Sequence, residues 1–342
     1  MTKLSVLLRV SGVIAVLGLM AVLAVPEASA AVCTPTGYVR DSINLTAAVI
    51  NPAAPVSGEV DATGCNIGVY FGPGAFGSVD GADVHGANYF GVVANGATVT
   101  VSNSSVHDIG ETPFNGSQHG VAIYLRAGAT GTITGNTVSQ YQKGGIVAND
   151  AGTTAEIAGN TVTGLSPVPF IAQNGIQLGY GATGSIRDNL VDGNSYSGSG
   201  WTSTGILIFE ANDVHVLKNT VVNNQTGIGI EAWCWIAPSA DGNQIVQNTV
   251  SGAQWGVTVA AYALGGYSSC DASASDNKVT NNDVSSTGGD IGIFVGTGVY
   301  YGSTFTPVAT NDKVNANAVS GFATGIDTGA TGTKAHANVI TP

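Results

Sequence analysis

The sequence has little charge, and most of what it has is negative. Only 9% of the 342 residues are Asp, Glu, Lys or Arg, and 10 Lys and Arg stand against 22 Asp and Glu, a formal net charge of -12. Globular domains usually carry far more charge. Because phosphate groups are bound by basic faces, this balance excludes nucleic acid and an anionic membrane surface as partners. Hydrophobic residues reach 44%, which excludes a disordered chain.

A second scarce feature is the long apolar run. One such stretch exists, residues 10–25, preceded by Lys3 and Arg9 and followed by the small residues 28–30. This order is typical of a secretory signal cut after Ala30. A membrane anchor is the alternative, but the apolar run is short for a membrane span. Cleavage removes two positive charges and one negative charge, Glu27, so the net charge falls from -12 to -13. We expect a secreted protein, in the extracellular space or the cell envelope.

Cysteine is also rare, with 4 residues in the chain. In an exported protein this number indicates two disulfides, and three connectivities are possible. The simplest pairs neighbours in sequence, Cys33 with Cys65 and Cys234 with Cys270. A zinc site is the alternative, but no two cysteines have the close spacing of zinc ligands.

What the sequence has in abundance is an internal repeat. The template is Ile or Val, two residues, Asn, one residue, and Val. Its copies are Ile133-Asn136-Val138, Ile157-Asn160-Val162, Ile186-Asn189-Val191, Val216-Asn219-Val221, Ile245-Asn248-Val250, Val279-Asn282-Val284 and Val314-Asn317-Val319. A weaker copy ends the chain at Ala335-Asn338-Ile340, and Val101-Ser104-Val106 and Val79-Ala82-Val84 extend the pattern upstream without Asn. Such periods predict a solenoid.

A second element follows the Asn, namely Gly and then alternating apolar residues. It occurs at Gly120, Gly145, Gly175, Gly205, Gly227, Gly256 and Gly325. Period-two spacing, β-branched residues and 49 glycines favour strands over helices. Stacking at about 4.8 Å per coil would bury Ile and Val of every turn in one core. The repeated Asn is expected to form an internal ladder of amide hydrogen bonds that satisfies groups beyond the reach of water.

These two elements resemble the repeats of the right-handed parallel β-helix family, which includes pectate-lyase-like enzymes, polysaccharide hydrolases and epimerases, and NosD-like periplasmic proteins. The resemblance implies an all-β chain, a single-stranded right-handed parallel β-helix of about nine to ten coils. It covers residues 79–342, and residues 31–78 would form the N-terminal cap and first coil. Repeats of this kind specify a fold and leave the activity open.

Residues at equal offsets from the repeated Gly should form columns along the outside of such a solenoid. One column precedes the Gly, with Gln118, His119, Gln142, Lys143, Gln173, Asn174 and Trp255. Five residues past the Gly come Asp150, Tyr180 and Glu210, with Tyr124 and Arg126 one way along the axis and Glu231 and Trp233 the other. Amides, acids and rings in parallel stripes suit a sugar chain, since rings stack on pyranose faces and polar groups bond hydroxyls.

Insertions between the repeats carry further aromatic residues. Residues 164–174 and 191–204 contain Phe170, Tyr196 and Trp201. Residues 233–243 and 261–276 contain Trp233, Trp235, Tyr262 and Tyr267. Loops from two sides could therefore wall a groove along the axis, which is where we expect substrate. The alternative is that these rings only pack the insertions onto the solenoid.

Two mechanisms fit the columns. In a uronate lyase, Lys143 or His119 would remove the proton and Arg126 would neutralise the carboxylate; the family resemblance adds calcium held by acids as a candidate cofactor, the one cofactor considered. In a hydrolase, two carboxylates flank the bond, and stacking would place Glu210 and Glu231 about 5 Å apart and Asp150 and Glu210 about 10 Å apart. The offset of one residue between Glu210 and Glu231 leaves open that they face different ways.

The candidate metal site is His107, Asp108 and Glu111. The triple-Asp pattern of the family's polygalacturonases and the Asp-Pro-His-Asp motif of its alginate epimerases are absent from the sequence, which counts against both activities.

The sequence therefore predicts a secreted monomer that binds polysaccharide and cleaves it, with a lyase favoured over a hydrolase. A non-catalytic glycan-binding or envelope protein is the second hypothesis. An ice-like flat binder is the third, and the irregular insertions argue against it.

Overall fold

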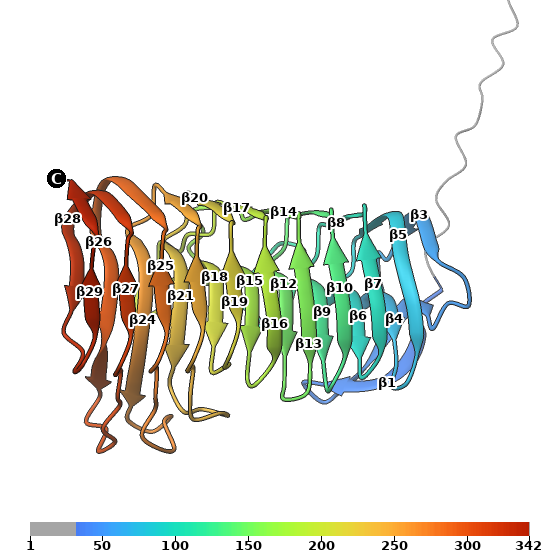
Figure 1. The fold of residues 1–342 in the computed structure, drawn as a ribbon. Coiled ribbons are helices and arrows are strands. Elements are labelled where there is room, and N and C mark those ends of the chain that lie inside the picture. Colours follow the sequence, from blue (N-terminus) through green and yellow to red (C-terminus); the bar gives the residue numbers. More distant parts are fainter. Residues whose placement is uncertain (1–31, 342) are drawn as a thin grey trace, which may run out of the picture.

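In the computed structural model, which describes residues 32–341, the chain winds into one long solenoid of strands (Figure 1). The predicted signal, residues 1–30, lies outside the described residues. Strands stack in three columns, each a mainly parallel sheet, and one strand from each column makes a coil. No helix of the described part is long and apolar enough to cross a bilayer. The predicted parallel β-helix is confirmed.

The strands of each column follow in chain order. The first column contains β2 (Ile43–Ile50), β4 (Ile67–Phe71), β6 (Phe90–Asn95), β9 (Val121–Arg126), β12 (Gly144–Asn149), β15 (Asn174–Gly179), β18 (Thr204–Phe209), β21 (Thr226–Ala232), β24 (Trp255–Leu264) and the later parts of β26 (Asp283–Tyr300) and β28 (Ala318–Thr328).

The second column contains β3 (Val56–Asp61), β5 (Phe76–His85), β7 (Thr98–Ser102), β10 (Thr130–Thr134), β13 (Thr154–Ala158), β16 (Thr183–Arg187), β19 (His215–Leu217), β22 (Gln244–Val246), β25 (Lys278–Thr280), β27 (Lys313–Asn315) and β29 (Lys334–His336). The third contains the end of β5, β8 (Ser105–His107), β11 (Thr137–Ser139), β14 (Thr161–Thr163), β17 (Leu190–Asp192), β20 (Thr220–Val222), β23 (Thr249–Ser251), the first parts of β26 and β28, and β30 (Val339–Thr341).

The residues that pair between neighbouring strands of a column are those at equivalent positions of the sequence repeat. In the first column Ile146 pairs with Ile176, which pairs with Ile206 and then Ile228. These side chains are fully buried and belong to one core that runs through the coils. Because successive side chains of a strand point to opposite faces, this register also sets which residues face outward. Equal offsets in the sequence therefore become neighbours along the axis, as expected.

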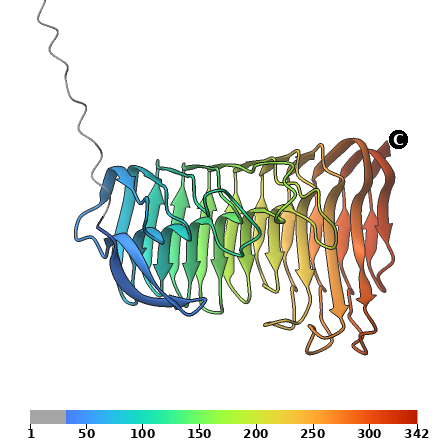
Figure 2. The same ribbon diagram turned by 180° about the vertical axis from the view of Figure 1, so that it is seen from behind.

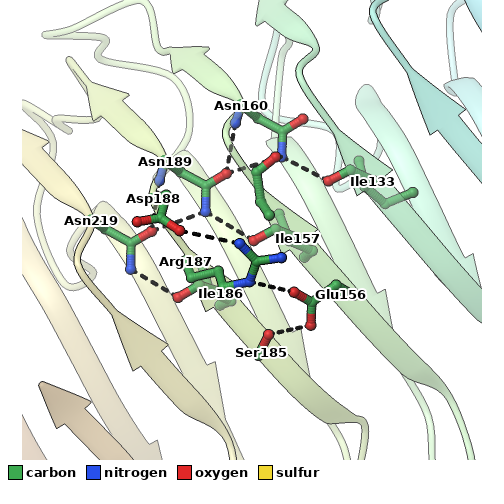
Figure 3. A network of polar contacts seen from close by, with 11 residues as sticks. Ile133, Glu156, Ile157, Asn160, Ser185, Ile186, Arg187, Asp188, Asn189 and Asn219 are labelled. Atoms are coloured by element: carbon green, nitrogen blue, oxygen red, sulfur yellow. Dashed lines mark hydrogen bonds and ion pairs between the residues drawn. The ribbon is translucent and has the colours of Figure 1, made fainter.

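The repeated Asn forms the predicted ladder at the corner between the second and third columns (Figure 3). The Nδ2 of Asn160 donates to Oδ1 of Asn189 at 2.9 Å, and Nδ2 of Asn189 donates to Oδ1 of Asn219 at 2.9 Å. Each amide also donates to a backbone carbonyl on the neighbouring coil, Ile133 O for Asn160 and Ile157 O for Asn189. The ladder continues to Asn338, and Ser104 takes its place at the other end.

The repeated Gly is required by close approach between coils. A Cβ on Gly175 would lie 2.5 Å from Cγ1 of Val191 and 2.6 Å from the carbonyl oxygen of Gly205 on the next coil. No side chain fits in that space, so the second residue of β12, β15, β18, β21 and β24 is Gly, and the Ile or Val that follows it turns into the core. In β9 this position is Ala122 instead of the expected Gly120, because Ile123 pairs with Ile146.

The N-terminal segment folds back over the outside of the first column (Figure 2). Strand β1 (Thr34–Arg40) pairs antiparallel with β2, and Tyr38 packs with buried outward-facing residues of the first coils. These are Leu45, Ala47, Ile67, Tyr70, Tyr89, Phe90, Val93, Val121, Tyr124 and Val147. The hairpin therefore covers the outer face of the column at this end of the solenoid.

Both expected disulfides are present. Cys33 joins Cys65, which holds the start of β1 to the turn before β4, and Cys234 joins Cys270, which links two insertions after β21 and β24. The described residues contain no free cysteine. Disulfides persist in oxidising compartments, which agrees with an extracellular or envelope location.

Replacing Asn189 with Leu tests the ladder. The variant loses two donated and two accepted hydrogen bonds of a side chain that is 2% exposed. It also leaves buried backbone groups unpaired. We expect a loss of unfolding free energy on the order of 3 kcal/mol, measured by urea unfolding. The exposed Thr220→Ser, on the following coil, should change it by less than about 0.5 kcal/mol. Equal unfolding midpoints for both variants would contradict the ladder's role.

Candidate functional site

A groove of about 1310 Å³ runs along the outward face of the first column. Its floor is made by outward-facing residues of β9 to β24, including Tyr124, Val147, Gln177, Leu207 and Thr258. The β1 hairpin closes one end. The groove lies where the insertions were expected to wall one. Insertions before the strands form one long edge, with Phe170, Ile171, Ala172, Tyr196, Gly200, Trp201 and Thr202. The other edge is formed by insertion residues after the strands and by the ends of β24 and β26, with Trp233, Trp235, Ile236, Tyr262, Leu264, Tyr300 and Tyr301.

Of the residues predicted for a site, most line this groove. They are Gln118, Tyr124, Arg126, Lys143, Asp150, Asn174, Tyr180, Trp201, Glu231, Trp233 and Trp255. The groove divides into two parts of different chemistry, named here by the strands beneath them. The basic half lies over β9, β12 and β15, and the aromatic half lies over β18, β21 and β24.

Cations are concentrated in the basic half. Arg40, Arg126 and Lys143 line the groove, whereas Arg187, Lys218, Lys278, Lys313 and Lys334 lie elsewhere on the described chain. Arg126 donates from Nε to Oδ2 of Asp150 at 3.3 Å and lies over the Tyr38 ring. Arg40 donates to the carbonyl oxygen of Gln118 at 2.6 Å. An acidic protein therefore directs three of its few cations into one groove.

Lys143 stands at the edge of the floor just before β12. Its ammonium donates to the carbonyl oxygen of Ala172 at 2.6 Å, and its side chain is partly buried by the insertion. Burial disfavours the charged form and lowers the pKa of Lys143 to about 8. Near neutral pH this amine is therefore far easier to deprotonate than a solvated lysine, which suits it to accept a proton from a bound molecule.

Lys143 and Arg126 occupy opposite edges of the floor. The backbone N–H of Lys143 donates to Gly120, and Gly120 precedes Arg126 by six positions along the strand, so the two attachment points lie about 20 Å apart. Each side chain is tied to its own edge, Lys143 to Ala172 and Arg126 to Asp150. The expected pairing of these two residues on a single uronate is therefore corrected: they would contact different parts of a substrate.

An amide network crosses the floor between those edges. Asn174 donates from Nδ2 to Oε1 of Gln177 at 3.0 Å, and Gln177 donates from Nε2 to Oδ1 of Asn149 at 3.0 Å. Gln177 and Asn149 face the groove but were not among the expected site residues. Their position is readable from the repeat, because each lies an even number of residues after the repeated Gly, Gly175 for Gln177 and Gly145 for Asn149.

Aromatic rings from both edges meet over the aromatic half. The ring of Trp201, in the insertion before β18, lies 6.1 Å from that of Trp233 and 5.8 Å from that of Trp235, in the insertion after β21. Trp235 in turn contacts Phe209 at 5.3 Å, and Trp233 contacts Tyr262 at 4.4 Å. The insertions therefore do more than pack onto the solenoid, since their rings bridge the groove.

Glu231 is the acid of the aromatic half. It lies on β21 opposite Phe209, and its Oε2 accepts a hydrogen bond from Nε1 of Trp233 at 3.0 Å. Burial among the rings raises the pKa of Glu231, and the Trp233 hydrogen bond only partly offsets this. Burial, together with the negative charge of Glu231, raises the pKa of Tyr262. The site therefore favours the protonated form of Glu231 more than water does.

Glu210 does not reach the groove, although it lies on the adjacent coil as expected. It is fully buried, and its two carboxylate oxygens accept hydrogen bonds from the backbone N–H groups of Trp235, Ile236 and Ala237 at 2.7–2.9 Å. The offset of one residue from Glu231 turns it away from the floor. Its expected catalytic role is corrected to anchoring the insertion that carries Trp233 and Trp235.

Three other expected site residues are buried under insertions. Gln142 and Gln173 are fully buried, and their amides bond backbone groups: Gln142 those of residues 111, 115, 117 and 119, and Gln173 those of residues 141, 142 and 165. His119 is 7% exposed, stacks on Tyr89 at 3.8 Å and pairs with Glu111 at 2.7 Å. None of the three lines the groove, so their expected substrate contacts are corrected to structural ones.

The candidate metal site is not assembled. His107 contacts Asp108 at 2.6 Å and Asp83 at 2.8 Å, whereas Glu111 pairs with His119 instead. Within residues 32–341 no three His, Cys, Asp or Glu side chains gather in a way that could hold a metal ion. Calcium, the cofactor considered, therefore has no cluster of three acidic ligands within the described residues.

The loop-anchoring role of Glu210 is tested by Glu210→Ala. Removing three charge-assisted hydrogen bonds should release residues 233–243, so the rings lose their fixed geometry while the coils persist. We expect the near-ultraviolet circular dichroism of the tryptophans to fall by about half or more and the far-ultraviolet spectrum to stay. Asp283→Ala, an exposed carboxylate on the third column, is the matched control. An unchanged near-ultraviolet spectrum in Glu210→Ala would refute the anchoring.

The chain is similar to several solved structures at low sequence identity. The chain is similar to the periplasmic alginate epimerase AlgG at 11% identity, covering 80% of this chain and 77% of that one with a TM-score of 0.43. It is similar to a polygalacturonase from Erwinia carotovora ssp. carotovora at 12% identity, covering 85% and 96% with a TM-score of 0.44.

A third similar structure is the A-module of a mannuronan C-5 epimerase from Azotobacter vinelandii, at 14% identity, covering 81% of this chain and 69% of that one with a TM-score of 0.40. No curated protein sequence matches the chain. The family profile described as "Right handed beta helix region" matches residues 59–203 and 91–268, which together span more than half of the sequence. The chain belongs to the right-handed β-helix family.

Proposed function

We propose that this protein is a secreted carbohydrate-active β-helix protein that binds an acidic polysaccharide along the groove and cleaves it as a uronate lyase. The observation that carries the proposal is Lys143, a partly buried amine with a pKa of about 8 in a groove that also holds Arg40 and Arg126. The groove extends along the axis over the strands from β9 to β24, so an extended polymer fits it better than a small molecule does.

The proposed reaction is a β-elimination. The neutral amine of Lys143 takes the proton at C5 of a uronate, and the electrons of that C–H bond form the C4–C5 double bond. The C4–O bond breaks, and the departing oxygen takes a proton, so the products are an unsaturated uronate end and a new hydroxyl end. Positive charge beside the carboxylate makes the C5 proton more acidic.

Arg40 is proposed to supply that charge in place of Arg126. It bonds the carbonyl of Gln118, two residues before Gly120, and Gly120 accepts the backbone N–H of Lys143. Arg40, on the β1 hairpin, and Lys143, on the coil of β12, thus stand at the same edge of the groove. Arg126, with Asp150 and Tyr124, would hold the chain at the opposite edge.

A hydrolase is the weaker proposal. Its two carboxylates must lie roughly 5–9.5 Å apart. Glu210 is buried away from the floor, and Asp150 stands three coils from Glu231, roughly 14 Å along the axis, where it pairs with Arg126. Glu231 therefore has no second carboxylate at a working distance among the residues that line the groove.

The proposal predicts that Lys143→Met abolishes cleavage. We expect at least a 100-fold loss of the rate at which ultraviolet-absorbing unsaturated ends appear from uronate polymers, with the fold intact by circular dichroism. Lys278→Met, which removes an exposed lysine of the second column, should keep the wild-type rate. Plain reducing ends without ultraviolet absorbance would indicate a hydrolase. Polymer binding without any product from the wild type would favour a non-catalytic glycan-binding protein.

The pH dependence follows from the direction of the Lys143 shift. The base acts when neutral, so activity should rise with pH and level off above about 8, where the amine has lost its proton. An unshifted lysine would level off near 10.4 instead. The measurement is the initial rate between pH 6 and about 10 on one polymer. A rate that falls steadily across this window would contradict Lys143 as the base.

A further inference from the structure

One position in the floor of the aromatic half, called here the hollow, lacks a side chain and is surrounded by three side chains that line the groove. Gly229 on β21 faces outward at a position that other coils fill with Gln177, Leu207 and Thr258. A Cβ built there would lie 3.3 Å from Oγ1 of Thr258, 3.5 Å from Oε1 of Glu231 and 3.5 Å from Cδ1 of Leu207. The backbone of Gly229 does not take a positive φ, so no conformational need explains the missing side chain. Its effect is to leave the hollow open.

Two polar atoms at the rim of this hollow are placed for a ligand. Thr258 is 4% exposed, and its Oγ1 is buried without a hydrogen-bond partner. A buried hydroxyl without a partner is unfavourable, and a bound sugar hydroxyl would recover that loss. Oε2 of Glu231 is engaged by Trp233, and no hydrogen bond within the described chain engages Oε1, which faces the space above Gly229. The hollow therefore offers one hydroxyl and one carboxyl oxygen side by side.

Apart from Glu231, the surroundings of the hollow are mostly apolar, and no cation lies beside it. Trp233, Tyr262 and Leu207 line this part of the groove, and its three cations lie in the basic half or on the β1 hairpin. A uronate carboxylate bound here would face Glu231 and gain no cation. A neutral sugar would place its C–H face on the rings and its hydroxyls on Thr258 and Glu231.

We propose that the hollow over Gly229 is a subsite for a neutral hexose, and that the natural substrate is a heteropolysaccharide in which neutral sugars accompany uronates. The inference rests on the proposed function, because it places this subsite on the same bound chain that Lys143 cleaves. Gly229 lies three coils from the strand that follows Lys143, roughly 14 Å along the axis. The neutral unit therefore lies several sugars away from the cleaved bond.

The test measures binding of two defined oligosaccharides of equal length by calorimetry. One contains only uronic acids, and in the other uronic acids alternate with neutral hexoses. Lys143→Met is used throughout so that the ligands stay intact, and each subsite change is added to it. We expect the alternating ligand to bind at least about 10-fold more tightly than the uniform one, equivalent to one well-placed interaction of about 1.4 kcal/mol.

Two variants should remove that preference. Thr258→Val deletes the unpaired hydroxyl and keeps the shape, so the melting temperature should hold or rise while the alternating ligand binds about 10-fold more weakly. Gly229→Ala places a methyl group where a sugar hydroxyl would lie, so it should also weaken binding of the alternating ligand. Thr249→Val, on the exposed third column, is the matched control and should change neither ligand.

The outcomes separate the two proposals. Cleavage of uronate polymers by the wild type, with equal binding of both oligosaccharides and no effect of Thr258→Val or Gly229→Ala, would overturn the neutral subsite and leave the lyase standing. If neither oligosaccharide binds and the wild type cleaves no polymer, both the lyase and the neutral subsite are overturned. Preference for the alternating ligand that both variants abolish is the result expected.

Discussion

The stacked hydrogen bonds between coils are the constraint on which the rest of the molecule depends. Each ladder Asn bonds the next Asn and a carbonyl of a neighbouring coil, so every coil is held at one rotation about the axis. A slip by one residue would turn Ile176 and its partners out of the core. The same fixed rotation aligns Lys143, Asn174 and Glu231 along a single outer face. The geometry of the groove on the first column is thus set by amides buried at another corner of the coil, between the second and third columns.

The groove depends on a second use of buried amides and acids. Gln142, Gln173 and Glu210 lie at the ends of first-column strands and bond the backbone of the insertions, which are too irregular to satisfy their own groups. A solenoid can lengthen a turn without disturbing its core, but the longer turn needs an anchor. These side chains supply it, and the insertions can then hold Trp201, Trp233 and Trp235 over the floor.

The difference between the regular coils and the irregular insertions explains how much the sequence could predict. Columns, ladder and fold follow from offsets, because parallel stacking converts equal spacing into contact. The direction in which Glu210 and Glu231 face depends on one residue of offset, and only the bonds to Trp235, Ile236 and Ala237 decide it. Arg40 carries no signal at all, since it lies outside the repeat on a hairpin whose path is set by packing on Tyr70 and Phe90.

Charge is distributed in a way that the net value conceals. A chain with net charge -12 repels a polyanion at long range. Yet Arg40, Arg126 and Lys143 share one groove, and interactions within the groove outweigh distant charges once salt screens the latter beyond about 8 Å. On this acidic protein, a polyanion would gain favourable electrostatic contacts only where it lies over these cations. The same reasoning separates the two halves of the groove: Glu231 takes the place of the cations in the aromatic half, so under the proposed function a polymer would need neutral sugars there.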